Sequence, residues 1–130
     1  MNKPYAQRLP GGFPEDVRLA AVDLRPQHVN ELAWPYPVAL RAVDALSGAG
    51  CAILGGDVYR MGENGLSITG DNWYLDRAQD LPWADYVQAA DAHARRYIAW
   101  CQSQHADACW YTLVFVSVDD YSALASHRTE

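Results

Sequence analysis

Two cysteines and a histidine near the end of the chain have a regular spacing that could bring metal ligands together. Cys101, His105 and Cys109 are spaced four residues apart, and His93 lies two helical turns before Cys101. Zinc requires several such ligands converging on one point. We expect Cys109 to begin a strand beyond the helix that carries the others, and no C-x2-C pair fixes two sulfurs. Because free cysteine often packs as a small hydrophobe, the sequence predicts core cysteines, no metal site and no cofactor.

A nucleophile paired with a general base would be a second kind of chemistry. The candidate nucleophiles and bases are Ser67, Ser117 and Cys51, with His93, His105 and His127. No pair is favoured by spacing, and neither G-x-S-x-G nor H-E-x-x-H is present. The acidic residues that could pair for acid–base work are expected as solvated loop surface; they are Asp71, Asp76, Asp80, Asp119 and Asp120. We therefore predict that the chain is not an enzyme.

Two glycines and an aspartate interrupt ILGGDVYRM, a run that is otherwise typical of a buried strand. Glycine weakens a strand, so Gly55 and Gly56 need a reason. The spacing of phosphate-binding loops is absent. A structural bulge or a close approach of another group to the backbone would each explain the pair. We take Gly55 and Gly56 as structural, and Asp57 and Tyr59 as candidate partner contacts.

A second candidate segment is DNWYLDR, residues 71–77, which we expect to be a loop before a long helix. Loops often carry function, and Trp, Tyr and Arg are enriched among the residues that dominate binding energy. The alternative is that the tryptophan closes the core while its neighbours bond to nearby backbone. The candidate partner contacts in this segment are Asp71, Asn72, Trp73, Tyr74 and Asp76.

The elements that must position these residues are predicted from apolar periodicity and turn signals. We expect an extended arm over residues 1–14, a helix over 14–24, a second helix within PVALRAVDALSGAG (residues 37–50), a third over 81–104, a hairpin over 51–69 and a strand over 109–118. The helix over 81–104 has the longest apolar stripe. The predicted fold class is α+β, a small, mainly antiparallel sheet packed with two to three helices.

Length and charge limit the function classes. The chain has 130 residues and fits one domain. Its formal net charge of −6 argues against nucleic-acid binding. No apolar run is long enough to span a membrane, and three cysteines are too few for a disulfide framework. We therefore expect a cytoplasmic protein without nucleic-acid or membrane partners.

The order of these motifs resembles the immunity protein 40 family, small bacterial proteins that accompany polymorphic secreted toxins. The resemblance covers about residues 34–117, whereas residues up to 33 match no pattern. Its most specific parts are Gly55-Gly56-Asp57-Val58-Tyr59, Asp71-Asn72-Trp73 and Trp83-Ala84-Asp85-Tyr86.

The resemblance implies a protein that binds and neutralises a cognate toxin effector domain by stoichiometric occlusion. A nuclease toxin would fit an acidic inhibitor, since Asp57, Asp71 and Asp76 would stand in for phosphates. The alternative is a small enzyme or ligand-binding domain, with Tyr59, Asp57 and His93 converging in a pocket between sheet and long helix. Self-association as a homodimer is compatible with both.

Overall fold

The computed structural model describes residues 9–29, 31–76, 81–105 and 109–121. Its elements in chain order are α1 (Glu15–Leu19), β1 (Val22–Asp23), the 3-10 helix η1 (Arg25–Gln27), β2 (Leu32–Pro35), α2 (Val38–Gly48), β3 (Ala52–Gly62), β4 (Gly65–Tyr74), α3 (Trp83–His105), β5 (Cys109–Thr112) and β6 (Val114–Val116). The predicted α+β class is confirmed, and α3 is the longest helix among the described residues.

The strands of the described ranges form one antiparallel sheet in the order β1-β2-β5-β3-β4, with β6 also paired to β3. β3 is central: β4 pairs along one side of it, and β5 and β6 pair in succession along the other. β5 and β6 occupy the single strand predicted over 109–118, which is interrupted at Leu113. β4 therefore forms one edge of the sheet.

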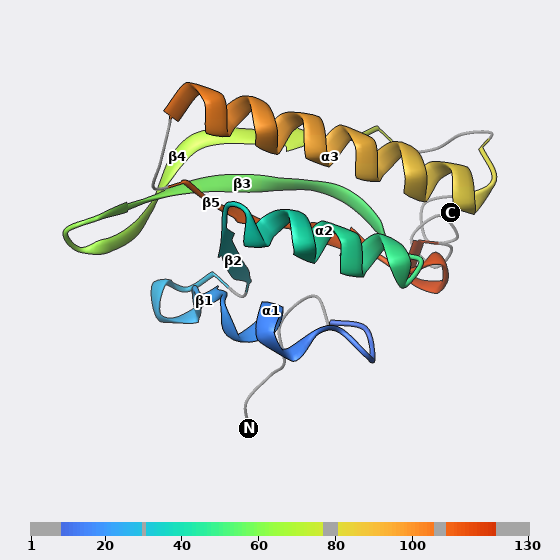
Figure 1. The fold of residues 1–130 in the computed structure, drawn as a ribbon, viewed down its shortest axis with the longest axis horizontal. Coiled ribbons are helices and arrows are strands. Elements are labelled where there is room, and N and C mark those ends of the chain that lie inside the picture. The colour runs from blue at the N-terminus through green and yellow to red at the C-terminus, as the bar shows by residue number, and fades with distance from the viewer. Residues whose placement is uncertain (1–8, 30, 77–80, 106–108, 122–130) are drawn as a thin grey trace, which may run out of the picture.

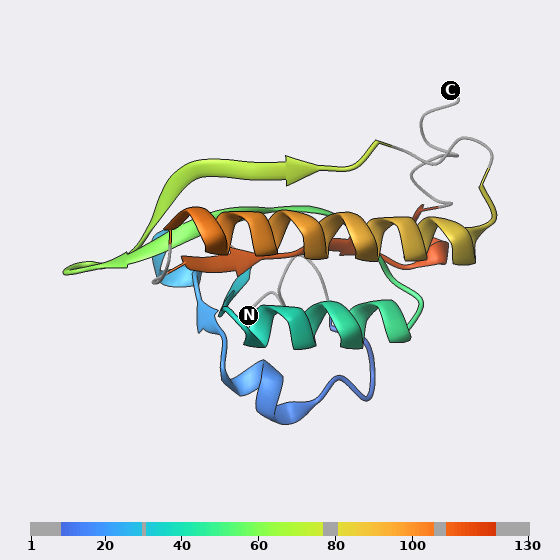
Figure 2. The same ribbon diagram turned by 45° about the horizontal axis from the view of Figure 1, so that its top comes forward.

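Helices α2 and α3 lie side by side in front of the strands (Figure 1). In the turned view α3 lies between α2 and β4 (Figure 2). The main core joins Val43 of α2 and Ile98 of α3 to Val58 and Tyr111 of the sheet. Tyr59 belongs instead to a second cluster with Leu24. Because neighbouring strand residues point to opposite faces, we call the side of the sheet that carries Tyr59 the outer face.

The prediction of a helix over 14–24 is wrong in its second half. The helix ends at Leu19, where the amide of Ala20 bonds back to carbonyls of the last turn, and the chain then extends into β1. Val22 pairs with Ala33 of β2, and Leu24 is fully buried. The apolar residues after Leu19 fit a helical spacing, but pairing with β2 makes this segment a strand instead.

The predicted arm over 1–14 falls within the described residues only from residue 9, and residues 9–14 contain no helix or strand. Asp80 and His127 lie outside the described residues. No helix in the described ranges has both the length and the apolar character to cross a membrane.

Candidate partner-binding surface

The loop predicted over residues 71–77 is wrong for its first half, because residues 71–74 complete β4. Asn72 pairs with Asp57 and Trp73 pairs with Gly56, so the hairpin extends beyond the predicted end at residue 69. Alternation places Trp73 on the side of α3, and Asn72 and Tyr74 on the outer face. The strand brings the two candidate segments together, but it divides their side chains between the two faces.

The glycine pair is required by close packing against its neighbours. A Cβ atom at Gly55 would lie 2.3 Å from the carbonyl oxygen of Trp73. At Gly56 it would lie 2.0 Å from the carbonyl oxygen of Thr112 and 2.6 Å from the indole of Trp73. In the pairing with β6, an extra residue of β3 lies between Ile53 and Gly55. The chain therefore carries glycine where another backbone and an aromatic ring come closest to β3.

Trp73 belongs to the core. Its side chain is only 5% exposed, and its ring stacks on that of Tyr97 in α3, with the centroids 5.1 Å apart. Tyr97 in turn contacts Trp100, at 5.9 Å between centroids, and Trp100 is 53% exposed. Trp73 therefore has little surface left for a partner. Trp100 was missed by sequence analysis, although an aromatic residue beside the apolar stripe of α3 was a signal for it.

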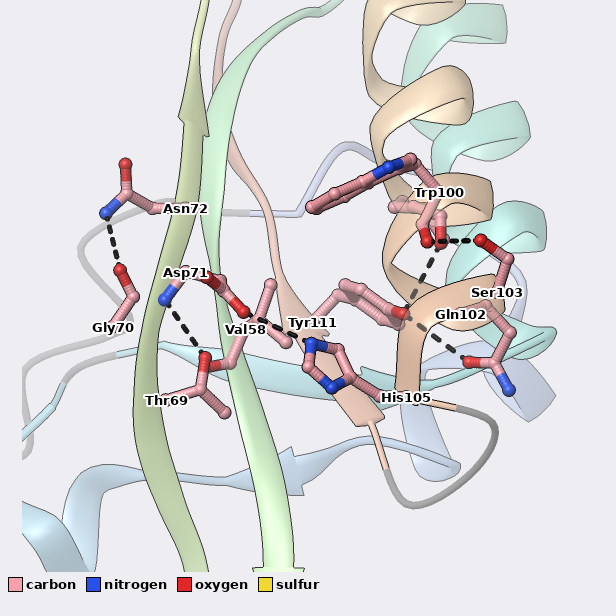
Figure 3. A network of polar contacts seen from close by, with 11 residues as sticks. Val58, Thr69, Gly70, Asp71, Asn72, Trp100, Gln102, Ser103, His105 and Tyr111 are labelled. Atoms are coloured by element: carbon pink, nitrogen blue, oxygen red, sulfur yellow. Dashed lines mark hydrogen bonds and ion pairs between the residues drawn. The ribbon is translucent and has the colours of Figure 1, made fainter.

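Asp71 is held by the end of α3. Its carboxylate lies 3.3 Å from Nε2 of His105, and its main-chain N–H donates to the hydroxyl of Thr69. That hydroxyl donates to the carbonyl of Val58, where β4 carries extra residues opposite β3. Figure 3 shows Asp71 pointing toward His105, and Asn72 pointing away from the helix. Asp71 therefore fastens β4 to α3 and is less available to a partner than the sequence implied.

The exposed candidates lie on the outer face and just beyond β4. Tyr74 is 70% exposed, and Asn72 and Asp76 are also exposed. Ile68, on the same strand, adds an apolar side chain that is 59% exposed. Tyr59, by contrast, is 4% exposed. Tyr74 and Ile68 are therefore the large apolar side chains that β4 leaves available to a partner on this face.

Asp57 lies beside a second acid that sequence analysis missed. The main-chain N–H of Asp57 donates to the hydroxyl of Thr112 at 2.9 Å. Burial, followed by the charge of Asp57, raises the pKa of Glu31 above its ordinary 4.5. Burial and the charges of both acids raise the pKa of Tyr59. Glu31 gave no signal, because it reaches this place only through the pairing of β2 with β5.

The three residues proposed to share a pocket lie on opposite sides of the sheet. Asp57 and Tyr59 lie on the outer face, whereas His93 belongs to α3, which packs on the opposite face. The expectation that these three residues converge is therefore wrong.

Nucleophilic and metal chemistry gain no support from the described residues. Burial raises the pKa of the thiols of Cys51 and Cys101, which disfavours their nucleophilic form. No group of three or more His, Cys, Asp or Glu within the described ranges is arranged to hold a metal ion.

Comparison with known proteins places the chain in a family. The family model described as immunity protein 40 matches residues 23–115, which include every strand from β2 to β5 and the helices α2 and α3. Searches of the curated proteins and of the solved structures gave no match. The matched range also includes all the candidate contact residues and Glu31. Because the match covers most of the chain, the chain belongs to the immunity protein 40 family.

Proposed function

We propose that this protein neutralises a secreted bacterial toxin by binding the toxin's effector domain in a stoichiometric complex and covering its working surface. The family match over residues 23–115 carries this proposal. The protein performs no chemistry in this scheme. Inhibition follows from a stable contact that the toxin's substrate cannot displace.

The outer face supports this role because it combines an exposed aromatic anchor with negative charge. Tyr74 presents a large ring next to strand positions that carry Asn72 and Asp57. Rings of this kind supply much of the binding energy at protein interfaces. The carboxylates and the net charge of −6 accelerate encounter with a basic partner.

A basic effector of the nuclease type is the toxin class that best fits this charge. Such an enzyme binds a polyanion, and carboxylates can occupy the places of phosphates. Asp57 and Asp76 are the remaining candidates for this mimicry, because Asp71 is engaged by His105. The protein would act in the cytoplasm, where its cysteines stay reduced.

The experiment is to produce the C-terminal domain of a secreted toxin encoded beside this gene, alone and with this protein. We expect an equimolar complex by size-exclusion chromatography with light scattering, loss of effector activity in vitro, and rescue of growth on co-expression. The same chromatography of the free protein tests the predicted homodimer. Absence of a complex, or turnover of the effector's substrate by this protein, would contradict the proposal.

A further inference from the structure

β4 forms an edge of the sheet whose main-chain groups are open to a partner near Tyr74. Among the described strands, β4 pairs only with β3. The N–H of Leu75 donates to the carbonyl of Leu54 at 2.8 Å, so the main-chain groups of position 75 face β3. Because hydrogen-bonded and non-hydrogen-bonded positions alternate in an antiparallel ladder, Tyr74 directs its N–H and C=O away from β3.

A second hydrogen bond agrees with this alternation. Asp57 is paired with Asn72, yet its N–H donates to the hydroxyl of Thr112 in β5, on the other side of β3. The Asp57–Asn72 pair is therefore a non-hydrogen-bonded one, and the main-chain carbonyl of Asn72 also points outward. Asn72 and Tyr74 thus offer outward main-chain groups two positions apart, which is the spacing that an added strand needs.

The stretch of outward groups is bounded at both ends. On one side β4 carries extra residues between Ile68 and Asn72 where it pairs with β3. A bulge of this kind bends an edge strand and interrupts its pairing. On the other side the carbonyl of Asp76 accepts a hydrogen bond from the hydroxyl of Tyr86 in α3 at 3.0 Å. We call residues 72–75, between these two limits, the open edge.

Exposed aromatic rings flank the open edge on the two faces of the sheet. Tyr74 lies on the outer face and is 70% exposed. On the other face, Figure 3 shows the ring of Trp100 pointing from α3 toward the strands. The ring of Tyr97 lies between Trp100 and Trp73 of β4, in contact with both. Since successive side chains of a strand point to opposite faces, a strand added here would place its side chains alternately on the Tyr74 side and on the Trp100 side.

Charge favours a basic strand over a second copy of this chain. β4 contains no Lys or Arg, and the whole chain has a net charge of −6. Asp57 is half-buried opposite Asn72, and Asp76 is exposed just beyond the strand. Two copies paired edge to edge would bring these carboxylates toward each other, and like charges on adjacent strands are unfavourable. A strand that carries Lys or Arg would instead be attracted.

We propose that the open edge adds one strand of the toxin effector domain to this sheet, and that this strand carries a basic side chain on the outer-face side. The inference rests on the proposed function and states how the effector is held. In strand addition, hydrogen bonds between main chains supply affinity, and the alternating side chains supply selectivity. Here the main-chain partners are Asn72 and Tyr74, and the rings of Tyr74 and Trp100 receive the side chains.

A proline substitution separates main-chain pairing from side-chain contact. Tyr74→Ala removes the ring and keeps the N–H, whereas Tyr74→Pro removes both. Proline is tolerated in an edge strand where the N–H faces solvent, so both variants should fold. Isothermal titration calorimetry with the effector domain should show Tyr74→Pro binding about tenfold more weakly than Tyr74→Ala, or weaker still. Equal affinities for the two folded variants would overturn the proposal.

Ile68→Ala and Ile68→Pro form the matched control pair. The carbonyl of Val58 accepts from the hydroxyl of Thr69 and so faces β4, which means that the next residue, Tyr59, faces away from β4. Ile68 pairs with Tyr59, and its main chain therefore also points outward. Because the bulge separates Ile68 from the open edge, its two variants should bind the effector equally. A proline effect at Ile68 as large as that at Tyr74 would contradict the assignment to the open edge.

Amide hydrogen exchange tests the same contact without any substitution. The N–H of Tyr74 has no ladder partner in the described part of the free protein and should exchange rapidly, and in the complex its exchange should slow by about tenfold or more. NMR of ¹⁵N-labelled protein distinguishes it from the N–H of Trp73, which β3 protects in both states. Unchanged exchange at Tyr74 in a complex that forms would overturn strand addition alone. Absence of any complex would instead refute the proposed function.

Two further measurements identify the occupant. Asp76→Asn should slow association with the effector domain several-fold, whereas Asp119→Asn, also exposed, should leave the rate unchanged. An Asp76 variant that associates as fast as wild type would contradict the basic character of the strand. Light scattering of the free protein tests a second copy as the occupant. A dimer that Tyr74→Pro dissociates would assign the open edge to self-association and overturn the proposal.

Discussion

Trp73 of the edge strand stacks on Tyr97 of the long helix, with the ring centroids 5.1 Å apart and the planes inclined by 28°. This contact fixes β4 to α3 on the helix side of the sheet. The Asp71–His105 pair fixes the same two elements near the end of the helix. With Trp73 and Asp71 turned inward, Asn72 and Tyr74 are left for a partner on the outer face. Packing on one face of the strand thus determines what the other face presents.

Replacing Trp73 by alanine should lower the free energy of unfolding by about 3–5 kcal/mol, since it removes a large buried ring and leaves a cavity. Trp73→Phe should cost much less. The phenyl ring still packs on Tyr97, and the indole N–H that it removes has no hydrogen-bond partner among the described residues. Urea denaturation followed by circular dichroism measures both. Equal losses for the two variants would show that the ring contact is not the source of the stability.

Gly56→Ala should destabilise the fold by about 2 kcal/mol or more, because the added methyl group would overlap the carbonyl oxygen of Thr112 at 2.0 Å. Gly48→Ala is the matched control. Gly48 ends α2 with no heavy atom within 4 Å of an added Cβ, so the same change there should be neutral or stabilising by up to about 1 kcal/mol. Thermal unfolding of the two variants checks this. A Gly56→Ala protein as stable as wild type would mean that β3 and β5 can separate without cost.

Sequence patterns predicted the elements whose signals are local. The apolar spacing from Val38 to Leu46, followed by glycine stop signals, indicated α2, and the stripe after Trp83 located α3 to within two residues. What could not be predicted depends on pairing between distant segments. Polar turn-forming residues at 71 and 72 indicated a loop, yet both lie in β4, where Asn72 pairs with Asp57 of β3. Glu31 becomes a site residue only because β5 lies between β2 and β3.

Tyr74→Ala should weaken the complex with the effector domain by about 2 kcal/mol or more while leaving the free protein as stable as wild type. A side chain that is 70% exposed contributes little to folding but can be buried by a partner. Leu19→Ala, on α1, is a suitable control because Leu19 is 66% exposed and α1 lies on the far side of α2 from β4 (Figure 2). Biolayer interferometry measures the affinity of each variant for the effector domain. If the Leu19 variant loses affinity and the Tyr74 variant does not, the binding surface has been placed on the wrong side of the protein.

The raised pKa of Glu31 predicts how stability depends on pH. The folded protein holds the Glu31 proton more tightly than the unfolded chain does, because burial and the charge of Asp57 oppose ionisation. The resulting contribution to stability is complete below the unfolded value, near 4.5, and is lost as the pH rises through the folded value. Glu31→Gln resembles the protonated acid at every pH. Its free energy of unfolding should therefore match that of wild type in acid and exceed it increasingly toward neutral pH. Urea titrations across this range measure the difference, with Glu63→Gln as an exposed control that should run parallel to wild type. A Glu31→Gln curve that falls below wild type toward neutral pH would mean that the ionised carboxylate is stabilised in the fold, and that the two acids do not repel each other there.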